Sequence, residues 1–424
     1  MFFCLALFLG NIHLKDSLEY LQQAINIRSH GSWYCGNLLL PIDPALFSQR
    51  PLLYGLFLSI TNWPSIGEWL PLLIQNILSF YNCILAMLLF ENITGKKISS
   101  IKLLWPMLFF ASQFIYANMI MSEILFQTSW MLATYFAIKF LKDFKQSHLI
   151  YHQLSITSAL LIKPIAYAFP LLSTLGLIIL VMQKKISSKI VATAFIPLST
   201  IVIILGSNYY HTSVVEFSSI QRKLMINYNI PQLLSKQMDE KSAVAKVDSL
   251  QQMAGTLSYP DRTRFIDQQC LHYITRSPIA YLSLHLKGVF RFFLDHGRWD
   301  LYTFFTGINL DQNAVNTLQN SYDHGGISSA TSYLSSFPKA VVAYLLLVFI
   351  LNLLSLIFFI RFLFNNEILK SIRITLALMV FYLAFLTGPT GSARFRVPIY
   401  PILLVSFAIT SINDQKRIAR AFKL

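Results

Sequence analysis

Charged residues are scarce in this sequence. Only 12% of its 424 residues are Asp, Glu, Lys or Arg, and 55% are hydrophobic, whereas soluble proteins carry about 25% charged residues. The mean hydropathy of +0.54 agrees with this composition. Several apolar runs reach the length of about 20 residues that a helix needs to cross a bilayer. The composition therefore excludes an ordinary soluble domain and predicts a membrane protein.

Several common patterns are also missing from the sequence. It lacks the alternation of period two that a membrane β-barrel needs, and backbone polar groups in lipid then require helices. It has no phosphate-binding loop, no G-x-S-x-G, no H-E-x-x-H and no G-x-G-x-x-G fingerprint, which argues against ATP-driven and zinc-protease chemistry. The four cysteines show no metal-binding spacing. We predict an all-α polytopic membrane protein.

The spacing of the apolar runs predicts about ten transmembrane helices. They fall at residues 1–13 (shorter than a full span), 66–91, 101–118, 121–141, 150–163, 165–182, 190–208, 337–360, 372–388 and 397–412. The net charge is +15, and its basic residues gather between spans near 96–102, 139–145, 184–189, 361–373 and 416–423. By the positive-inside rule these connections are cytoplasmic. Both chain ends are then expected inside, and no nucleic acid is expected as a partner.

This topology divides the chain into three parts. They are an N-terminal transmembrane catalytic module (1–208) with a first outer loop (14–65), an extracytoplasmic helical segment (209–336), and C-terminal transmembrane helices with a short basic cytoplasmic tail (337–424). Within the second part, Pro260 and Pro278 each begin a predicted helix. The helix from Pro278 is amphipathic and basic, and we expect it to lie along the outer membrane surface.

Two acidic residues lie next to predicted spans, both on the expected outer face. Asp16 begins a D-x-x-E pattern; it would either cap the following helix or accept a proton from an acceptor hydroxyl. Glu123 begins the span 121–141. It is either an acid favoured by the helix dipole, with Ser122 as the cap, or a functional carboxylate, because acids at membrane depth are costly.

Four cations on the expected outer edge run against the positive-inside pattern: Arg50, Lys163, Arg394 and Arg396. They would either extend to lipid headgroups or bind a lipid-linked phosphate, which a guanidinium holds with two hydrogen bonds. The glycines of the segment 388–391 would let the backbone approach a ligand closely.

These motifs occur in an order that resembles a known family. The run contains Asp16 and Tyr20, Arg50-Pro51-x-x-Tyr54, Ser122-Glu123, Lys163-Pro164, and Ala393 to Pro401 in ARFRVPIYP. It resembles the opening and close of the C-type (GT-C fold) polytopic glycosyltransferases, and of family 39 in particular. That family includes protein O-mannosyltransferases, the lipid A aminoarabinose transferase and lipopolysaccharide core transferases.

The resemblance implies a glycosyltransferase of cell-envelope glycan biosynthesis that uses a polyprenyl-phosphate sugar. Its acceptor would be a lipid, glycan or protein on the periplasmic face of a bacterial inner membrane. Asp16 and Glu123 would be catalytic, and the four cations would bind the donor phosphate. Glu19, Tyr20 and Tyr54 are further site candidates. A divalent metal is left open, with Asp16 and Glu123 as its acidic ligands.

Two alternatives come from other classes of protein. An O-antigen polymerase or ligase acting on lipid pyrophosphate glycans would place its key residues in 209–336, such as Arg291 and Arg298. A transporter or lipid flippase would carry discontinuous helices and charges near the middle of the membrane, and the predicted spans hold few such charges.

Overall fold

The computed structural model describes the chain except for residues 64–66, 309–325, 330, 333–334, 336–337 and 422–424. The end of the 209–336 segment and the last residues of the basic tail therefore lie outside the described residues. Within the described ranges every regular element is a helix and no strand occurs. The prediction of an all-α protein is confirmed.

Among the residues that the structure describes, seven helices are long and apolar enough to cross a membrane. They are α5 (Trp69–Thr94), α8 (Glu123–Asp143), η2 with α10 (Pro164–Ala166, Phe169–Met182), η3 with α11 (Ser188–Ala194, Phe195–Thr212), α19 (Lys339–Leu363), α20 with η5 (Lys370–Thr387, Gly388–Thr390), and α21, η6 and α22 (Ala393–Arg396, Val397–Ile399, Tyr400–Ala421). These helices support the predicted membrane protein.

The other three predicted spans form shorter helices. Residues 1–13 contain α1 (Phe2–Leu9), and α9 (Gln146–Ile162) has 17 residues. The span 101–118 is divided into α6 (Ser100–Leu104), η1 (Trp105–Phe109) and α7 (Ala111–Ala117). Pro106 lies in η1, and a proline inside a helix removes a backbone donor and clashes with the preceding turn.

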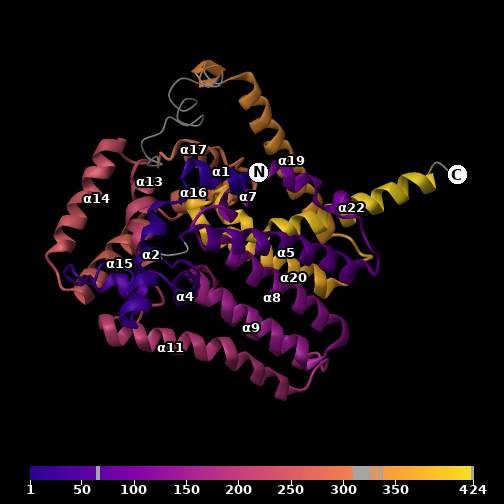
Figure 1. Ribbon diagram of the computed structural model, residues 1–424, viewed down its shortest axis with the longest axis horizontal. Coiled ribbons are helices and arrows are strands. Elements are labelled where there is room, and N and C mark those ends of the chain that lie inside the picture. Colours follow the sequence, from indigo (N-terminus) through magenta and orange to yellow (C-terminus); the bar gives the residue numbers. More distant parts are fainter. Residues whose placement is uncertain (64–66, 309–325, 330, 333–334, 336–337, 422–424) are drawn as a thin grey trace.

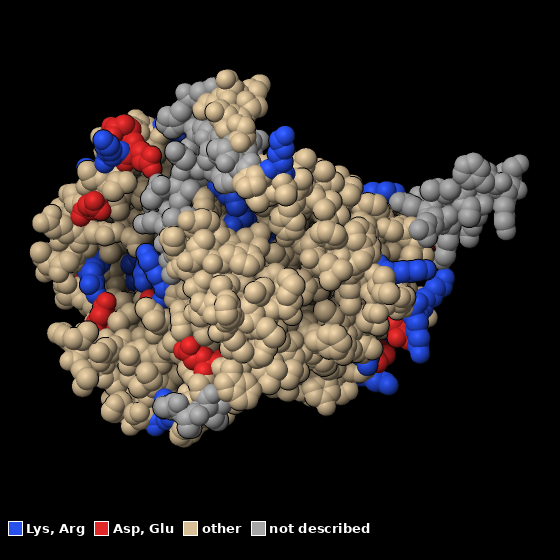
Figure 2. Space-filling model, turned by 45° about the horizontal axis from the view of Figure 1, so that its top comes forward, with Lys and Arg blue, Asp and Glu red and all other residues tan. Residues whose placement is uncertain are grey.

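The long helices pack side by side into a bundle (Figure 1). α8 packs against α9, α5 and α20, and α22 packs against α19 and α5. Figure 2 shows a broad central region free of charged side chains on one face, basic side chains at the end next to the C terminus, and a hollow bordered by charged side chains at the opposite end. This distribution of charge is what a membrane-embedded bundle requires.

Buried amides hold the start of α8 in place. Gln127 donates to the backbone oxygen of Val397 at 2.6 Å and exchanges hydrogen bonds with Gln113 at 2.8 Å. Asn82 donates to the Gln127 side chain at 2.8 Å. Because buried polar groups are costly without partners, this network ties α5, α7 and α8 to the turn that follows α21.

Two shorter groups of helices complete the chain. The first loop contains α2 (Lys15–His30), α3 (Ala45–Ser48) and α4 (Leu52–Thr61). The 209–336 segment contains α12 (Ile220–Leu224), a π-helix η4 (Met225–Asn229), α13 (Ile230–Leu234), α14 (Glu240–Gly255), α15 (Tyr259–Arg276), α16 (Pro278–Leu294) and α17 (Arg298–Thr306). The helices predicted to begin near Pro260 and Pro278 are therefore present as α15 and α16.

The 209–336 segment has a small core of its own. Ile230, Val247, Leu250 and Cys270 are buried together among η4 and α13 to α15, which lie at one end of the bundle (Figure 1). Glu216 fastens this segment to the first loop, since its carboxylate accepts hydrogen bonds from Ser48 at 2.7 Å and Tyr259 at 2.5 Å. Cys270 and Cys35 are both free thiols.

A close crossing of two backbones positions the loop before α21. α16 packs against η5 and α21, and at Gly288 a Cβ atom would overlap the carbonyl oxygen of Gly388. A Cβ at Gly391 would overlap the carbonyl oxygen of Gly288 in the same way. The glycines of 388–391 thus allow the close approach of α16, and their approach to a ligand stays a prediction.

We expect Gly288→Ala to destabilise the protein by about 1–3 kcal/mol, the usual cost of overpacking, because backbone atoms cannot move aside as a side chain can. The midpoint of unfolding in an SDS titration measures this loss. Gly176→Ala, in α10, is the control, since a Cβ there meets nothing within 4 Å. An unchanged midpoint for Gly288→Ala would show that the crossing can open without cost.

Candidate functional site

Six charged side chains that the sequence singled out meet at one end of the bundle. We call Asp16, Glu19, Arg50, Glu123, Lys163 and Arg394 the ionic cluster. Arg50 pairs with Asp16 at 2.6 Å and with Glu19 at 2.5 Å. Arg394 pairs with Asp16 at 2.9 Å and also with Glu123, which pairs with Lys163 at 2.8 Å. These contacts form one continuous chain of ion pairs.

The cluster joins the ends of separate elements. Asp16 and Glu19 lie three residues apart in α2, so they face the same side of the helix. Arg50 precedes α4, and Lys163 lies between α9 and η2. Glu123 is the first residue of α8, and Arg394 lies in α21. The fold therefore gathers residues that are up to 378 positions apart.

The way α2 begins leaves the carboxylate of Asp16 free to pair with arginines. The helix begins at Lys15 with Leu14 at the N-cap, and the backbone N–H of Leu14 donates to Ser17 Oγ at 2.8 Å. The interpretation of Asp16 as the helix cap was wrong, because Leu14 is the N-cap residue and Ser17 binds its backbone N–H. Both oxygens of Asp16 are bound by guanidinium groups instead.

Aromatic side chains form the wall behind Arg50. Its guanidinium lies 4.9 Å from the centre of the Tyr20 ring, and Tyr20 packs edge-on against Tyr54 at 4.7 Å. Tyr20 shares a hydrogen bond of 3.1 Å with Ser122, and Tyr54 donates to Gln75 at 2.8 Å. The two tyrosines predicted as site residues thus hold the arginine in place, with their hydroxyl groups engaged elsewhere.

Glu123 is the most deeply buried member of the cluster, with a side chain that is 0% exposed. Its Oε1 atom accepts from Lys163 and Arg394. Its Oε2 atom is buried and has no hydrogen-bond partner in the part of the chain that the structure describes. A buried carboxylate oxygen without a partner is costly, so Oε2 is suited to accept a hydrogen bond from a bound molecule.

Neighbouring charges in the cluster shift the pKa values of its members. Burial alone would raise the pKa of Asp16, but the positive charges of Arg394 and Arg50 outweigh it and hold that pKa well below its ordinary value. Burial alone would lower the pKa of Arg50, whereas neighbouring Tyr20 and Asp16 raise it above its ordinary value. Asp16 is thus an anion while both arginines contact it, and in that state it is a weak base.

Arg396 lies apart from the cluster. It is 1% exposed, and it donates to the backbone oxygens of Phe293 and Asp295, the latter at 2.7 Å. The carboxylate of Asp295 accepts the backbone N–H of Ala393 at 2.7 Å. Arg396 and Asp295 therefore fasten α21 to the end of α16 and hold Arg394 in position, although the sequence grouped Arg396 with the phosphate-binding cations.

Two residues that the sequence did not single out adjoin the cluster. Lys223, in α12, pairs with Glu19 at 3.4 Å. Asp300, in α17, accepts from Tyr116 at 2.8 Å and from Ser112 at 2.7 Å, and Arg394 lies 5.8 Å from the Tyr116 ring. Burial raises the pKa of Asp300 to about 6. No local motif marked either residue, since both lie in ordinary polar sequence.

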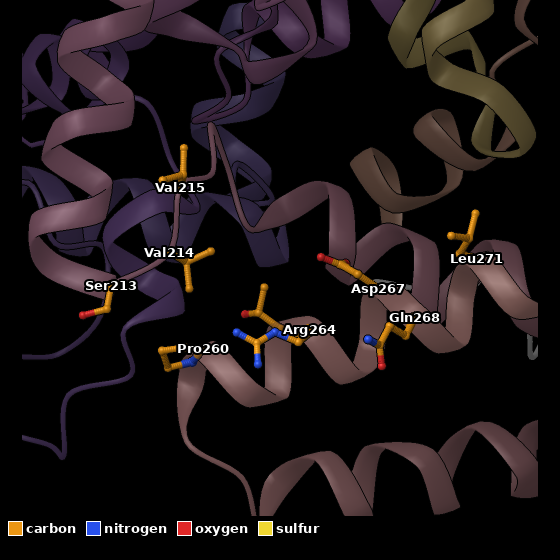
Figure 3. A pocket seen from close by; sticks show the side chains of 9 residues that line it. Ser213, Val214, Val215, Pro260, Arg264, Asp267, Gln268 and Leu271 are labelled. Atoms are coloured by element: carbon orange, nitrogen blue, oxygen red, sulfur yellow. The ribbon is translucent and has the colours of Figure 1, made fainter.

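A surface pocket of about 430 Å³ lies between residues 213–215 and α15. Figure 3 shows residues 213–215 on one side of it and a row along α15 on the other, which includes Arg264, Asp267 and Gln268. Asp267 pairs with Arg222 at 2.9 Å. Because Arg222 and Lys223 are neighbours, the short helix α12 contacts both the cluster and Asp267, a residue that lines this pocket.

The described residues contain no group of three or more His, Cys, Asp or Glu side chains placed to hold a metal ion. In the cluster each carboxylate is already paired with a cation. Comparison of the chain with family models and with curated proteins finds no match. The function must therefore be argued from the geometry of the cluster itself.

Proposed function

We propose that this chain is an integral-membrane glycosyltransferase. It would move a sugar from a polyprenyl-phosphate donor to a lipid, glycan or protein acceptor at the outer face of a bacterial inner membrane, with ten membrane crossings and both ends inside. The observation that carries this proposal is the ionic cluster, in which cations from three separate segments converge at one end of an apolar bundle.

Arg50, Arg394 and Lys163 are suited to bind the phosphate of the donor. Guanidinium groups bind phosphate oxygens with two parallel hydrogen bonds, and preorganised cations stabilise the charge that develops on a leaving group. The side chains of Arg50 and Lys163 are only 8% and 12% exposed. Their positive charge therefore acts where little water screens it.

Asp16 would become the base when the phosphate binds. As phosphate oxygens take over the guanidinium groups of Arg50 and Arg394, Asp16 loses the charges that lower its pKa and becomes more basic. An oxygen of the acceptor then forms a bond to the anomeric carbon, and the bond from that carbon to the phosphate oxygen breaks. The acceptor proton passes to Asp16, and polyprenyl phosphate leaves as the anion held by the cations.

An apolar groove on the bundle is suited to hold the lipid chain of such a donor. It has a volume of about 570 Å³ and lies between α10 and α20, where Leu171, Phe381 and Phe385 line it. Tyr382 lines the same groove and donates to the backbone oxygen of Ile165 at 2.6 Å, two residues after Lys163. An apolar chain in this groove would thus place its phosphate end near the cluster.

The direct test uses purified protein and a panel of polyprenyl-phosphate sugars. Release of polyprenyl phosphate in the presence of candidate acceptors would support the proposal, and mass spectrometry of the acceptor would identify the sugar. Release from none of these donors, by protein that remains folded, would contradict it.

The polymerase alternative makes a different prediction about Arg291. This residue lies on the exposed side of α16, away from the contacts that build the cluster. We expect Arg291→Gln to leave the rate of sugar transfer within about twofold, because surface substitutions without buried partners have small effects. A loss comparable to that of a cluster variant would favour a site in the 209–336 segment, as in a polymerase or ligase.

A further inference from the structure

The ionic cluster is electrically balanced without any contribution from the 209–336 segment. Three carboxylates, Asp16, Glu19 and Glu123, face three cations, Arg50, Lys163 and Arg394. A phosphate diester carries one negative charge. A further cation beside the cluster would strengthen its attraction for such an anion.

Lys223 supplies that additional charge. Its Nζ atom lies 3.4 Å from Glu19 Oε1, and its side chain is 49% exposed. A pair this long and this exposed contributes little stability, because water screens it. By contrast, the pairs of Arg50 are 2.5 and 2.6 Å long, and that side chain is 8% exposed. The ion pair between Lys223 and Glu19 is therefore the one that an incoming anion can replace at the lowest cost in free energy.

The element that carries Lys223 is fixed on both sides of the contact. Before it, Arg222 pairs with Glu216 at 2.8 Å and with Asp267 at 2.9 Å. After it, the helix continues into the π-helix η4 (Met225–Asn229), which packs against η5 ahead of Arg394. π-helical turns are rare in proteins, and those that occur are often found at functional sites. The backbone at Lys223 is thus held while its long side chain stays accessible.

We propose that Lys223 is a specificity-determining residue that recognises the phosphate of the lipid donor. This inference rests on the proposed function and adds that the 209–336 segment contributes a cation to the site. The phosphate takes the place of Glu19 on Lys223, whose exposed ammonium group can meet it without breaking a buried ion pair. Lys223 also distinguishes the phosphorylated lipid from the neutral polyprenol.

Binding of polyprenyl phosphate to the full-length protein in nanodiscs tests this role. We expect Lys223→Gln to bind polyprenyl phosphate about tenfold more weakly, the loss of one charge-assisted hydrogen bond, and Lys223→Glu to bind more weakly still. Lys223→Arg should restore most of the affinity. Binding of neutral polyprenol should be the same for all variants.

The kinetic readout separates recognition from chemistry. With a donor that the wild-type protein uses, Lys223→Gln should raise KM about tenfold and leave kcat nearly unchanged. Lys236→Gln, which removes an exposed lysine of the same segment, is the matched control and should change neither constant.

The outcomes distinguish the two levels of the proposal. If the wild-type protein prefers polyprenyl phosphate to polyprenol but Lys223→Gln binds both as the wild type does, the role of Lys223 is refuted and the proposed function stands. If the wild-type protein shows no preference for the phosphorylated lipid, the proposed function itself fails.

Discussion

Asp16→Asn is expected to abolish sugar transfer while the protein still inserts and folds. The amide has almost the same shape as the carboxylate, but it cannot take a proton from the acceptor. General base catalysis contributes about 100- to 10,000-fold to a rate, so the residual activity should be lower by about that factor. Transfer from a polyprenyl-phosphate sugar, measured with donor and acceptor at saturation, would show the loss in kcat.

The control for Asp16 is Asp43→Asn in the same loop. Asp43 also accepts from an arginine, Arg262, at 3.1 Å, but its side chain is 46% exposed and lies outside the cluster. We expect transfer by this variant to stay near that of the wild type. Full transfer by a well-folded Asp16→Asn protein would show that another group takes the proton, and Glu123 would be the next candidate.

The sequence predicted much of the cluster because charge is rare in this chain. Only 12% of the residues are charged. An acid or arginine at the expected outer edge of a span is costly there, so each one indicates a candidate functional residue. Asp16, Arg50, Glu123, Lys163 and Arg394 were found in this way, and the structure brings all five together.

Other features depend on contacts that no sequence pattern records. Arg396 resembles Arg394 in its local sequence, yet it turns toward the end of α16 and binds backbone oxygens. The close approach of Gly288 to Gly388 joins two segments 100 residues apart. Lys223 stands in a polar segment where lysine is common, so its place beside Glu19 follows only from how that segment folds back on α2.

The spans were predicted with mixed success for a physical reason. The composition of a run shows whether it is apolar, and on this basis the sequence predicted the long helices α5, α8, α19 and α20. Composition does not measure continuity of the backbone. The apolar run that contains Pro106 is therefore divided into three short helices, although the run as a whole is nearly long enough to cross a bilayer.

Glu123→Gln should remove both stability and activity, and a second substitution should restore only the stability. In this variant the side chain of Lys163, which is 12% exposed, loses its carboxylate partner. Breaking a buried ion pair by removing one member costs about 3–5 kcal/mol. The variant should therefore unfold at a lower fraction of SDS in mixed micelles and show little transfer.

The double variant Glu123→Gln/Lys163→Gln separates these two effects. It removes one charge of each sign, and two amides in place of an ion pair of 2.8 Å can hydrogen-bond to each other. Asp16 and Glu19 would remain balanced by Arg50 and Arg394. Most of the lost stability should return, because replacing both members of a buried pair is close to neutral.

Transfer should not return with stability in the double variant. The donor phosphate would still lack one cation, and the bound molecule would lack the carboxylate oxygen Oε2 that has no partner among the described residues. The same SDS titration and transfer assay, applied to the wild type, both single variants and the double variant, measure the coupling between the two residues. Recovery of both properties together would show that the pair only supports the fold, and the proposed role of Glu123 and Lys163 in the site would have to be abandoned.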